Sequence, residues 1–281
     1  MKGMMMGLLA ETPIHPGSGR GDGVIDLPVA REAGTDYPVL VGSSLKGALR
    51  DHATKCLPES EGHEEKREKR LEDWFGSREC AGGFLITEGR LLLLPVRSLT
   101  GAVRWATCPQ LLERLTRDLG RIGVKLNHAL PDVKDGEVLG CNVGKLFLEE
   151  RLFQGAGSVP EEWIAAVAPL IRHQLTRERL AKTMVILTDK DFAWFARYGL
   201  TVQARNQLEA KTKQSKSLWY EETLPPDTLM YTMLFDRAGA AGAAAETWFP
   251  ESRPYLQVGG NETVGQGWFA VAPYPAQGGG A

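Results

Sequence analysis

Short apolar runs, spread over the whole chain and separated by helical segments, constrain the fold more than any other feature. The runs that read as buried strands are residues 4–10, 91–94, 183–187 and 228–235. The segments that read as helices are residues 42–56, 109–120, 160–180 and 189–197. This mixture of strands and helices, without an internal repeat, predicts an α+β or split βαβ fold rather than an all-β fold.

The remaining segments are expected to form shorter strands, loops and one charged insertion. Further strands are expected at residues 39–41, 83–94, 200–208, 216–220, 255–258 and 267–272. Loops or irregular structure are expected at 12–38, 124–160 and 238–246, with a disordered tail at 275–281. The charge run at 58–73 predicts a solvated helix face or a mobile insertion. We therefore expect residues 1–281 to form a single domain with a charged helical insertion near 58–73.

Composition places the chain among globular proteins. Of its 281 residues, 43% are hydrophobic, and the formal net charge is −2. Free-standing nucleic-acid binders are usually basic, so this balance argues against that class while leaving room for one basic face. No apolar run reaches the roughly 18 residues needed to span a membrane, and the four cysteines (Cys56, Cys80, Cys108 and Cys141) are far apart. We expect a cytoplasmic protein with reduced thiols; the alternative is a zinc site that includes a histidine such as His128.

Asp26 lies in the glycine-containing segment 12–38, between apolar residues and directly before Leu27-Pro28. His15 lies in the same segment. Taken alone, an aspartate at this position is typical of a turn. The segment is nevertheless an unusual place for an isolated carboxylate between apolar neighbours.

The stretch VGSSLKGALR has the features of an anion site at the start of a helix. Ser43 and Ser44 lie where hydroxyls and unpaired backbone N–H groups face outward. Lys46 and Arg50 are four residues apart and share one helix face. The stretch lacks the first glycine of a phosphate-binding P-loop, so the alternative is an ordinary surface helix.

The stretch QVGGNETVGQGWF contains a glycine loop between two expected strands. Its glycines are Gly259, Gly260, Gly265 and Gly267, which allow close approach of the main chain and exposure of its amides to a ligand. No helix follows, which argues against a dinucleotide site. The alternative is a flexible hairpin loop.

Together these stretches resemble the RAMP superfamily of CRISPR proteins. The resemblance rests on ETPIHPGSG, GVIDLPVARE and YPVLVGSSLKGALR near the N-terminus and on LQVGGNETVGQGW near the C-terminus. Between them, DWFGS, AGGFLITEGRLLLLPVRS and LWYEETLPPDTLMY resemble the backbone subunit of the type III-B (Cmr) effector complex. The resemblance extends from residue 7 to residue 269.

The resemblance implies a modified RNA-recognition-motif (ferredoxin-like) palm with a β-hairpin thumb near 199–222 and insertions. It also implies that copies of the chain stack along a guide RNA, together with other Cmr-type subunits. Each copy would cut guide-paired, single-stranded target RNA at regular intervals with a divalent metal, Mg²⁺ or Mn²⁺. No membrane is implied as a partner.

The resemblance also assigns roles to residues. Asp26 is implied to be the cutting residue; it would hold the metal or orient the 2′-OH or a water molecule for attack. His15 either positions the phosphate or packs structurally. For Glu221 and Glu222 we favour a solvated or interface role over a catalytic one. Glu88 stands where family members commonly carry aspartate, which weakens any role for this position in metal binding.

The remaining predicted RNA contacts are basic. Arg97 is assigned to RNA binding. Arg205, Lys211, Lys213 and Lys216 surround the expected thumb turn, where they either grip the RNA backbone or form an ordinary surface hairpin. Two other functions stay open: a non-catalytic RNA-binding scaffold, and a guide-processing nuclease that works without metal through His15.

Overall fold

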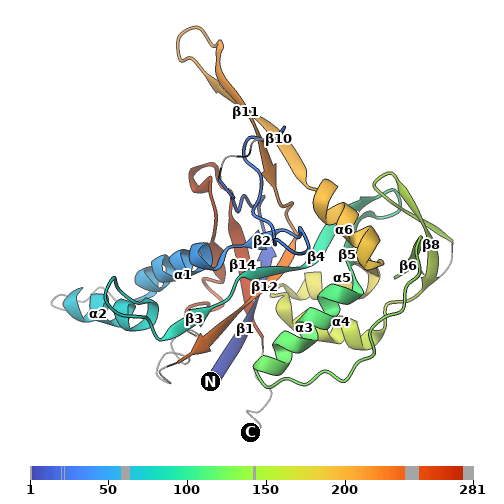
Figure 1. Cartoon of the computed structure of the whole chain (residues 1–281), viewed down its shortest axis with the longest axis horizontal. Coiled ribbons are helices and arrows are strands. Elements are labelled where there is room, and N and C mark those ends of the chain that lie inside the picture. Colours follow the sequence, from blue (N-terminus) through green and yellow to red (C-terminus); the bar gives the residue numbers. More distant parts are fainter. Residues whose placement is uncertain are drawn as a thin grey trace.

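The computed structural model describes residues 2–19, 21, 23–57, 64–141, 144–237 and 247–274. These residues form one large sheet with helices on both sides and a two-stranded hairpin that projects from it (Figure 1). The expected α+β class is confirmed. None of the helices within the described ranges is long and apolar enough to cross a membrane.

The centre of the sheet is antiparallel. In order across the sheet, its strands are β13 (Tyr255–Gln257), β14 (Trp268–Pro273), β1 (Lys2–Ala10), β12 (Leu229–Asp236) and β4 (Gly89–Ser98). Two short strands extend it: β2 (Val39–Leu40) pairs with β4, and β3 (Phe84–Ile86) pairs with β12. The apolar run at the N-terminus therefore forms an inner strand, as its composition predicts.

Beyond β4 the sheet curves back on itself like a barrel. The strands after β4 are β5 (Ala102–Thr107), β9 (Met184–Ile186), β6 (Glu137–Leu139), β8 (Arg151–Gly157) and β7 (Lys145–Leu148). The circuit closes because Leu148 of β7 pairs with Ser98 at the end of β4. Closure of this kind leaves few unpaired strand edges.

Side chains of β1 alternate between two cores, as expected for a strand with both faces buried. Met6 and Leu8 pack into one core and Met5 and Leu9 into the other. The first core includes side chains of α1 (Gly42–Cys56), α2 (Glu64–Phe75) and α6 (Asp189–Tyr198). The second includes α3 (Pro109–Arg121), α4 (Glu161–Val167), the 3₁₀ turn η1 (Ala168–Leu170) and α5 (Gln174–Thr183).

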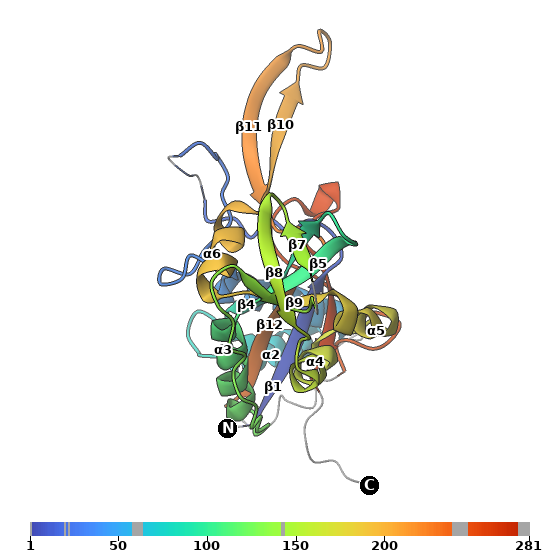
Figure 2. The ribbon, with the colours of Figure 1, turned by 90° about the vertical axis from the view of Figure 1, so that its right-hand side faces the viewer.

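A β-hairpin follows α6 and projects away from the sheet (Figures 1 and 2). Its strands are β10 (Thr201–Leu208) and β11 (Ser215–Thr223), paired in antiparallel register with Ala204 opposite Tyr220. The predicted hairpin near 199–222 is confirmed. A further 3₁₀ turn, η2 (Glu262–Val264), lies in the glycine loop between β13 and β14.

Two expectations about secondary structure are wrong. Residues 124–160 were expected to be irregular but contain β6, β7 and β8, which are short strands stabilised by pairing with one another and with β9. The expected helix at 160–180 is divided into α4, η1 and α5. The interruption contains Pro169, which supplies no backbone N–H for the helical hydrogen bond.

The expected strand at 83–94 divides into β3 and a longer β4, and β5 was not expected. Within the charge run, residues 64–73 belong to α2, whose charged side chains are mostly exposed. Residues 58–63, 238–246 and 275–281 lie outside the described residues.

Candidate functional site

Asp26 is fixed at the base of the hairpin. The outer edge of β11 binds the segment around it, because Leu27 donates its N–H to the Tyr220 carbonyl at 3.0 Å and Glu222 donates its N–H to the Leu27 carbonyl at 3.0 Å. The Tyr220 N–H donates to Oδ2 of Asp26 at 2.8 Å. Oδ1 receives no hydrogen bond from the described residues. The sequence suggested a pliable loop, but a backbone ladder holds this carboxylate in place.

His15 is anchored on the same edge of β11. Its Nδ1 lies 2.8 Å from the Glu222 carbonyl, and the ring is buried. A carbonyl oxygen only accepts, so Nδ1 donates the hydrogen of this bond. Tyr220 and Glu222 are two residues apart, or roughly 7 Å along a strand. Asp26 and His15 are therefore attached to neighbouring points of one strand edge.

Glu221 and Glu222 are not solvated. They are 2% and 4% exposed and point to opposite faces of β11. Glu222 accepts hydrogen bonds from the Val29 N–H at 3.0 Å and from Nη2 of Arg31 at 2.8 Å, so it fixes the segment that follows Asp26. Glu221 accepts from Nδ2 of Asn261 at 2.6 Å. The solvated alternative was wrong; both glutamates lie at contacts inside the chain.

The glycine loop contacts His15. Gly260 donates its N–H to the His15 carbonyl at 3.1 Å, and Gly267 donates its N–H to Pro13 at 3.0 Å. The Gly265 N–H is bonded within the loop to Glu262. The expectation that successive amides face a ligand is therefore wrong for these three glycines, because their N–H groups already have partners inside the chain.

A cleft of about 580 Å³ joins three of the predicted features. Its lining includes Ser44 and Gly47 of α1, Gly259 and Gly260 of the glycine loop, and His15. Ser43, Ser44 and Lys46 are exposed at the start of α1. The tertiary structure thus places the helix N-terminus and the glycine loop, which are far apart in sequence, on one cleft.

Two carboxylates also line this cleft, Asp51 and Glu262. Nζ of Lys55 lies 2.6 Å from Oδ2 of Asp51, and this hydrogen bond raises the pKa of Lys55. The lysine therefore stays charged and offsets the negative charge of Asp51. The charge of Glu262 also raises the pKa of Lys55, more weakly than Asp51 does. The Glu262 carboxylate would oppose a phosphate that came close to it.

Two predicted RNA contacts are engaged elsewhere. Arg50 donates to the Gly76 carbonyl at 3.0 Å and pairs with Glu68 of α2 at 3.1 Å. Arg97 pairs with Glu149 at 2.9 Å. Each guanidinium group already pairs with a glutamate of the chain, so neither is the unpaired cation that the sequence suggested.

The basic residues of the hairpin divide into two groups. Lys211, Lys213 and Lys216 are exposed at or near the turn. Arg205 instead lies 3.6 Å from Glu221 at the base of the hairpin. Of these four basic residues, the three lysines are the more exposed.

Glu88 is exposed on the rim of a second cleft, of about 550 Å³, which shares Val41 with the first. Asp26 is far from Glu88 in the sequence and lines neither of these two clefts. The two carboxylates are therefore not brought together in one site.

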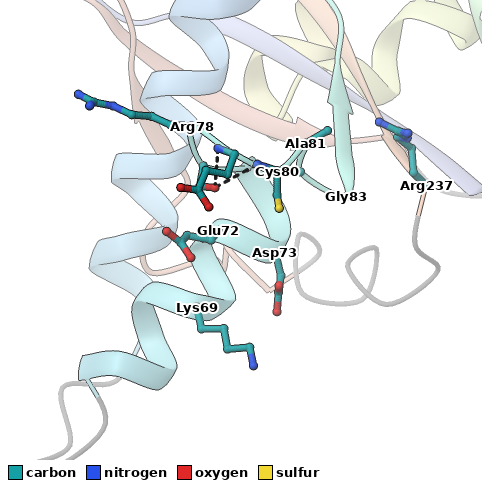
Figure 3. A pocket seen from close by; sticks show the side chains of 11 residues that line it. Lys69, Glu72, Asp73, Arg78, Cys80, Ala81, Gly83 and Arg237 are labelled. Carbon is teal, nitrogen blue, oxygen red and sulfur yellow. Dashed lines mark hydrogen bonds between the residues drawn. The ribbon is translucent and has the colours of Figure 1, made fainter.

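A larger cavity, of about 1020 Å³, opens beside α2 and the segment 77–83 (Figure 3). Its lining carries three basic side chains (Lys69, Arg78 and Arg237) and three acidic ones (Glu72, Asp73 and Glu79). Figure 3 shows Arg78 and Arg237 at opposite ends with Glu72 and Asp73 between them. This balanced lining does not suit a phosphate chain, and we assign it no role.

The described residues contain no group of three or more His, Cys, Asp or Glu side chains that could hold a metal ion. Asp26 offers one oxygen, Oδ1, for such an ion. Mg²⁺ is commonly held by one or two carboxylates with substrate phosphates and water completing its coordination. Asp26 therefore fits a metal ion only as its single protein ligand, with oxygens of bound RNA and water as the other ligands. His128 packs against Trp163, and none of the four cysteines, all within the described ranges, forms a disulfide.

Sequence reasoning missed Arg31, Tyr220 and Asn261. Arg31 and Tyr220 lie inside quoted motifs, but nothing in their local sequence indicates what they bond to. Asn261 adopts a left-handed backbone conformation (φ 63°) and reaches Glu221, forty residues earlier. An asparagine beside a glycine pair is a recognisable signal for that conformation.

Comparisons with known proteins agree with this architecture. A model of the RAMP superfamily matches residues 8–270. The Cmr endoribonuclease Cmr4 of Pyrococcus furiosus is 32% identical over 289 residues, covering 96% of this chain and 95% of that protein. The crystal structure of oligomeric Cmr4 from the same organism superposes with a TM-score of 0.74 at 27% identity, with 98% of each chain covered.

A type III-B Cmr-beta complex bound to cognate target RNA contains a chain that superposes with a TM-score of 0.76 at 20% identity, again with 98% of each chain covered; this likeness shows the fold alone. The chain belongs to the RAMP superfamily. Its similarity to the backbone subunit of type III-B (Cmr) systems, expected from the sequence motifs, is confirmed.

Proposed function

We propose that the chain is the guide-RNA-binding backbone subunit of a type III-B CRISPR interference complex and an endoribonuclease that cleaves guide-paired target RNA at regular intervals. One observation carries the proposal: Asp26 is fixed by β11 at the base of a projecting hairpin, and its Oδ1 receives no hydrogen bond from the residues that the structure describes. The name of the Pyrococcus furiosus relative, a Cmr endoribonuclease, supports the same activity. Its partners would be guide RNA, target RNA, further copies of the chain and other Cmr-type subunits, in the cytoplasm.

The proposal includes a single domain built on an RNA-recognition-motif-like palm. In chain order, β1, β4, β12 and β14 are the first to fourth strands of this unit. Their antiparallel order across the sheet, β14–β1–β12–β4, is therefore 4-1-3-2, which is the order of a ferredoxin-like βαββαβ unit and supports the palm. The β10–β11 hairpin would be the thumb of this palm, and α2 the charged insertion.

Guide RNA would lie along the cleft between α1 and the glycine loop. Ser43, Ser44 and Lys46 are exposed there and can bind phosphate oxygens. Gly259 and Gly260 leave room for a sugar-phosphate chain because they carry no side chain. Lys211 and Lys213 at the hairpin turn would contact the backbone of the RNA that passes the thumb.

Cleavage would depend on Asp26 as a positioned base. Oδ2 is held by the Tyr220 N–H, so Oδ1 can accept the proton of a 2′-OH or of a water molecule as that oxygen attacks the neighbouring phosphate. One phosphorus–oxygen ester bond of the RNA backbone breaks as the new bond forms, and the leaving oxygen takes a proton from water. His15 would keep the strand edge and the glycine loop in register through its ring and its carbonyl. A divalent metal, Mg²⁺ or Mn²⁺, would supply charge stabilisation on the RNA phosphate, with Asp26 as its protein ligand.

The decisive variant is Asp26→Asn in the complex assembled on guide RNA. Asparagine keeps an acceptor for the Tyr220 N–H and removes the charge, so guide loading and target binding should be unchanged. Cleavage of target RNA should fall about 100-fold or more, as expected for loss of a general base or metal ligand. Asp135→Asn, at an exposed carboxylate paired with Lys190, is the control and should cut at the wild-type rate.

The same assay separates the alternatives. If Asp26→Asn cuts at the wild-type rate, the proposed role of Asp26 is wrong. If cleavage survives chelation and requires His15 instead, the chain is a metal-independent nuclease; if the wild-type complex binds target without cutting it, the chain is a scaffold. Restoration of activity by Mg²⁺ after chelation would support the metal.

A further inference from the structure

Helix α6 presents two aromatic side chains to solvent. Trp194 and Tyr198 are 37% and 64% exposed and lie one helical turn apart, with ring centroids separated by 5.8 Å. Residues four apart lie on the same helix face. Two exposed rings side by side form a flat apolar surface, and covering them would remove a large apolar area from water.

Each ring is paired with an arginine. The guanidinium carbon of Arg151 lies 5.3 Å from the Trp194 ring centroid, and that of Arg197 lies 5.9 Å from the Tyr198 centroid. Both distances fall within the range of cation–π contacts. The face therefore consists of two rings and two planar guanidinium groups.

Carboxylates hold both arginines in place. Arg151 lies 2.5 Å from Oδ1 of the buried Asp191, and Nε of Arg197 lies 2.7 Å from Oδ2 of Asp36. These pairs fix the orientation of the guanidinium planes and offset their charge. What remains on the surface is a set of flat groups with little net charge, which suits a nucleobase better than a phosphate.

The helix is attached to the Asp26 segment and to the hairpin. Arg31 donates through Nη1 to the Ala196 carbonyl of α6 and through Nη2 to Glu222 of β11, at 2.8 Å in each case. β10 begins at Thr201, three residues after Tyr198. Figures 1 and 2 both show α6 at the base of the projecting hairpin.

We propose that Trp194, Tyr198, Arg151 and Arg197 form a stacking platform for one unpaired base of the target RNA near the Asp26 segment. Single-stranded RNA is commonly bound by bases that stack on aromatic rings and on arginine planes. This inference rests on the proposed function and specifies how target RNA is held there. A protein partner is the competing occupant; we favour a base because both arginines are already paired with carboxylates and present flat, neutralised planes.

The platform predicts a specific salt dependence. A phosphate contact releases counterions, so its loss changes the slope of affinity against salt. Stacking on a neutralised surface releases few ions. Removal of the rings should therefore lower target affinity by a similar factor at every salt concentration.

The test uses the complex assembled on guide RNA and a target RNA with a single 5-iodouridine, placed at each position in turn. In the wild type, photocrosslinks should form to the α6 peptide at one or a few recurring positions. The double variant Trp194→Leu, Tyr198→Leu should lose these crosslinks and bind target about 10-fold more weakly, in the range for loss of one base stack. Tyr255→Leu, at another exposed tyrosine (41%) on β13, should change neither.

Crosslinks elsewhere, with unchanged target affinity of the double variant, would overturn the platform. Loss of copies from the assembled complex with intact target affinity would also overturn it and indicate a contact between protein subunits. A changed salt slope would indicate phosphate binding instead of stacking. The cleavage rate is measured separately in the same complexes at saturating target. Crosslinks and target affinity therefore test the platform, whereas the cleavage rate tests the proposed nuclease.

Discussion

At the scale of single residues, Glu222 determines more of the candidate site than its position in the sequence suggests. Its carboxylate binds the Val29 N–H and Arg31, and its carbonyl binds His15. One buried residue of β11 thus contacts the segment on both sides of Asp26. A buried carboxylate is stable here because each oxygen has a donor.

Glu222→Gln should lower the free energy of unfolding by about 1–3 kcal/mol, because Arg31 loses its anionic partner while remaining largely buried. Chemical denaturation of the isolated chain measures this. Glu149→Gln removes the partner of the exposed Arg97 and should cost less than about 1 kcal/mol. Equal effects of the two variants would contradict the assigned importance of Glu222.

Substitutions of Lys46 and Arg50 should have different effects, although both residues lie on α1. Lys46 is exposed beside the cleft, so Lys46→Glu should weaken guide binding and reduce the salt slope by about 0.7 for the lost phosphate contact. Arg50 binds Gly76 and Glu68, so Arg50→Glu should mainly reduce stability. Guide affinity across a salt series, with thermal unfolding of each variant, checks both. A larger change of slope in Arg50→Glu would reverse the assignment.

At the scale of elements, β11 joins separate segments. One edge pairs with β10 and the other with the Asp26 segment, while Glu221 reaches the glycine loop. The projecting part of the hairpin is two-sided: Val202, Leu218 and Tyr220 lie on one face and are exposed, whereas Arg205 lies on the other. An apolar face on a projecting hairpin suits insertion beside RNA bases.

The glycine loop offers a comparison of two glycines that both have positive φ. A Cβ at Gly259 (φ 96°) would lie 2.7 Å from the His15 carbonyl oxygen, whereas one at Gly265 (φ 81°) would meet nothing within 4 Å. Gly265→Ala should cost only backbone strain, about 1–2 kcal/mol. Gly259→Ala should cost more and should also weaken guide binding, because His15 must move. Stability and guide affinity of the folded fraction are the measurements; equal losses would show that the contact with His15 is unimportant.

At the scale of the whole molecule, the sheet is buried between two cores, and the predicted RNA-binding parts extend from its edges and ends. The central strand β1 illustrates how tightly the layers pack. A Cβ at Gly7 would lie 1.9 Å from the carbonyl oxygen of Leu170 in η1. Helical segments on that side therefore approach the sheet at a point where only glycine fits.

Gly7→Ala should destabilise the protein by about 3 kcal/mol or more, since the clash is with backbone and cannot be relieved by a side-chain rotation. Gly120→Ala is the matched control in α3, where a Cβ meets nothing within 4 Å. It should stabilise the protein by about 0.5–1 kcal/mol through helix propensity. Calorimetry or denaturant unfolding of both variants checks the pair, and a neutral Gly7→Ala would contradict the packing described.

The local sequence pattern was sufficient to predict those elements whose stability depends mainly on their own residues. The apolar run of β1, the leucine spacing of α3 and the turn between β10 and β11 are each visible in the sequence. β6, β7 and β8 were missed because each has only a few residues and is stabilised by partners distant in the chain. The division of 160–180 was missed because Pro169 was outweighed by the helical signals around it.

The sequence by itself determined the α+β class, the projecting hairpin, the family motifs and Asp26 as the residue of interest. Only the tertiary structure decided how these parts meet: that β11 holds Asp26 and His15, that Glu221 and Glu222 are buried, that Arg50 is engaged with α2, and that α6 lies at the base of the hairpin. The physical reason is that hydrogen bonds, ion pairs and burial join residues far apart in the chain, such as His15 and Glu222. Periodicity and motif spacing report only on near neighbours in the chain.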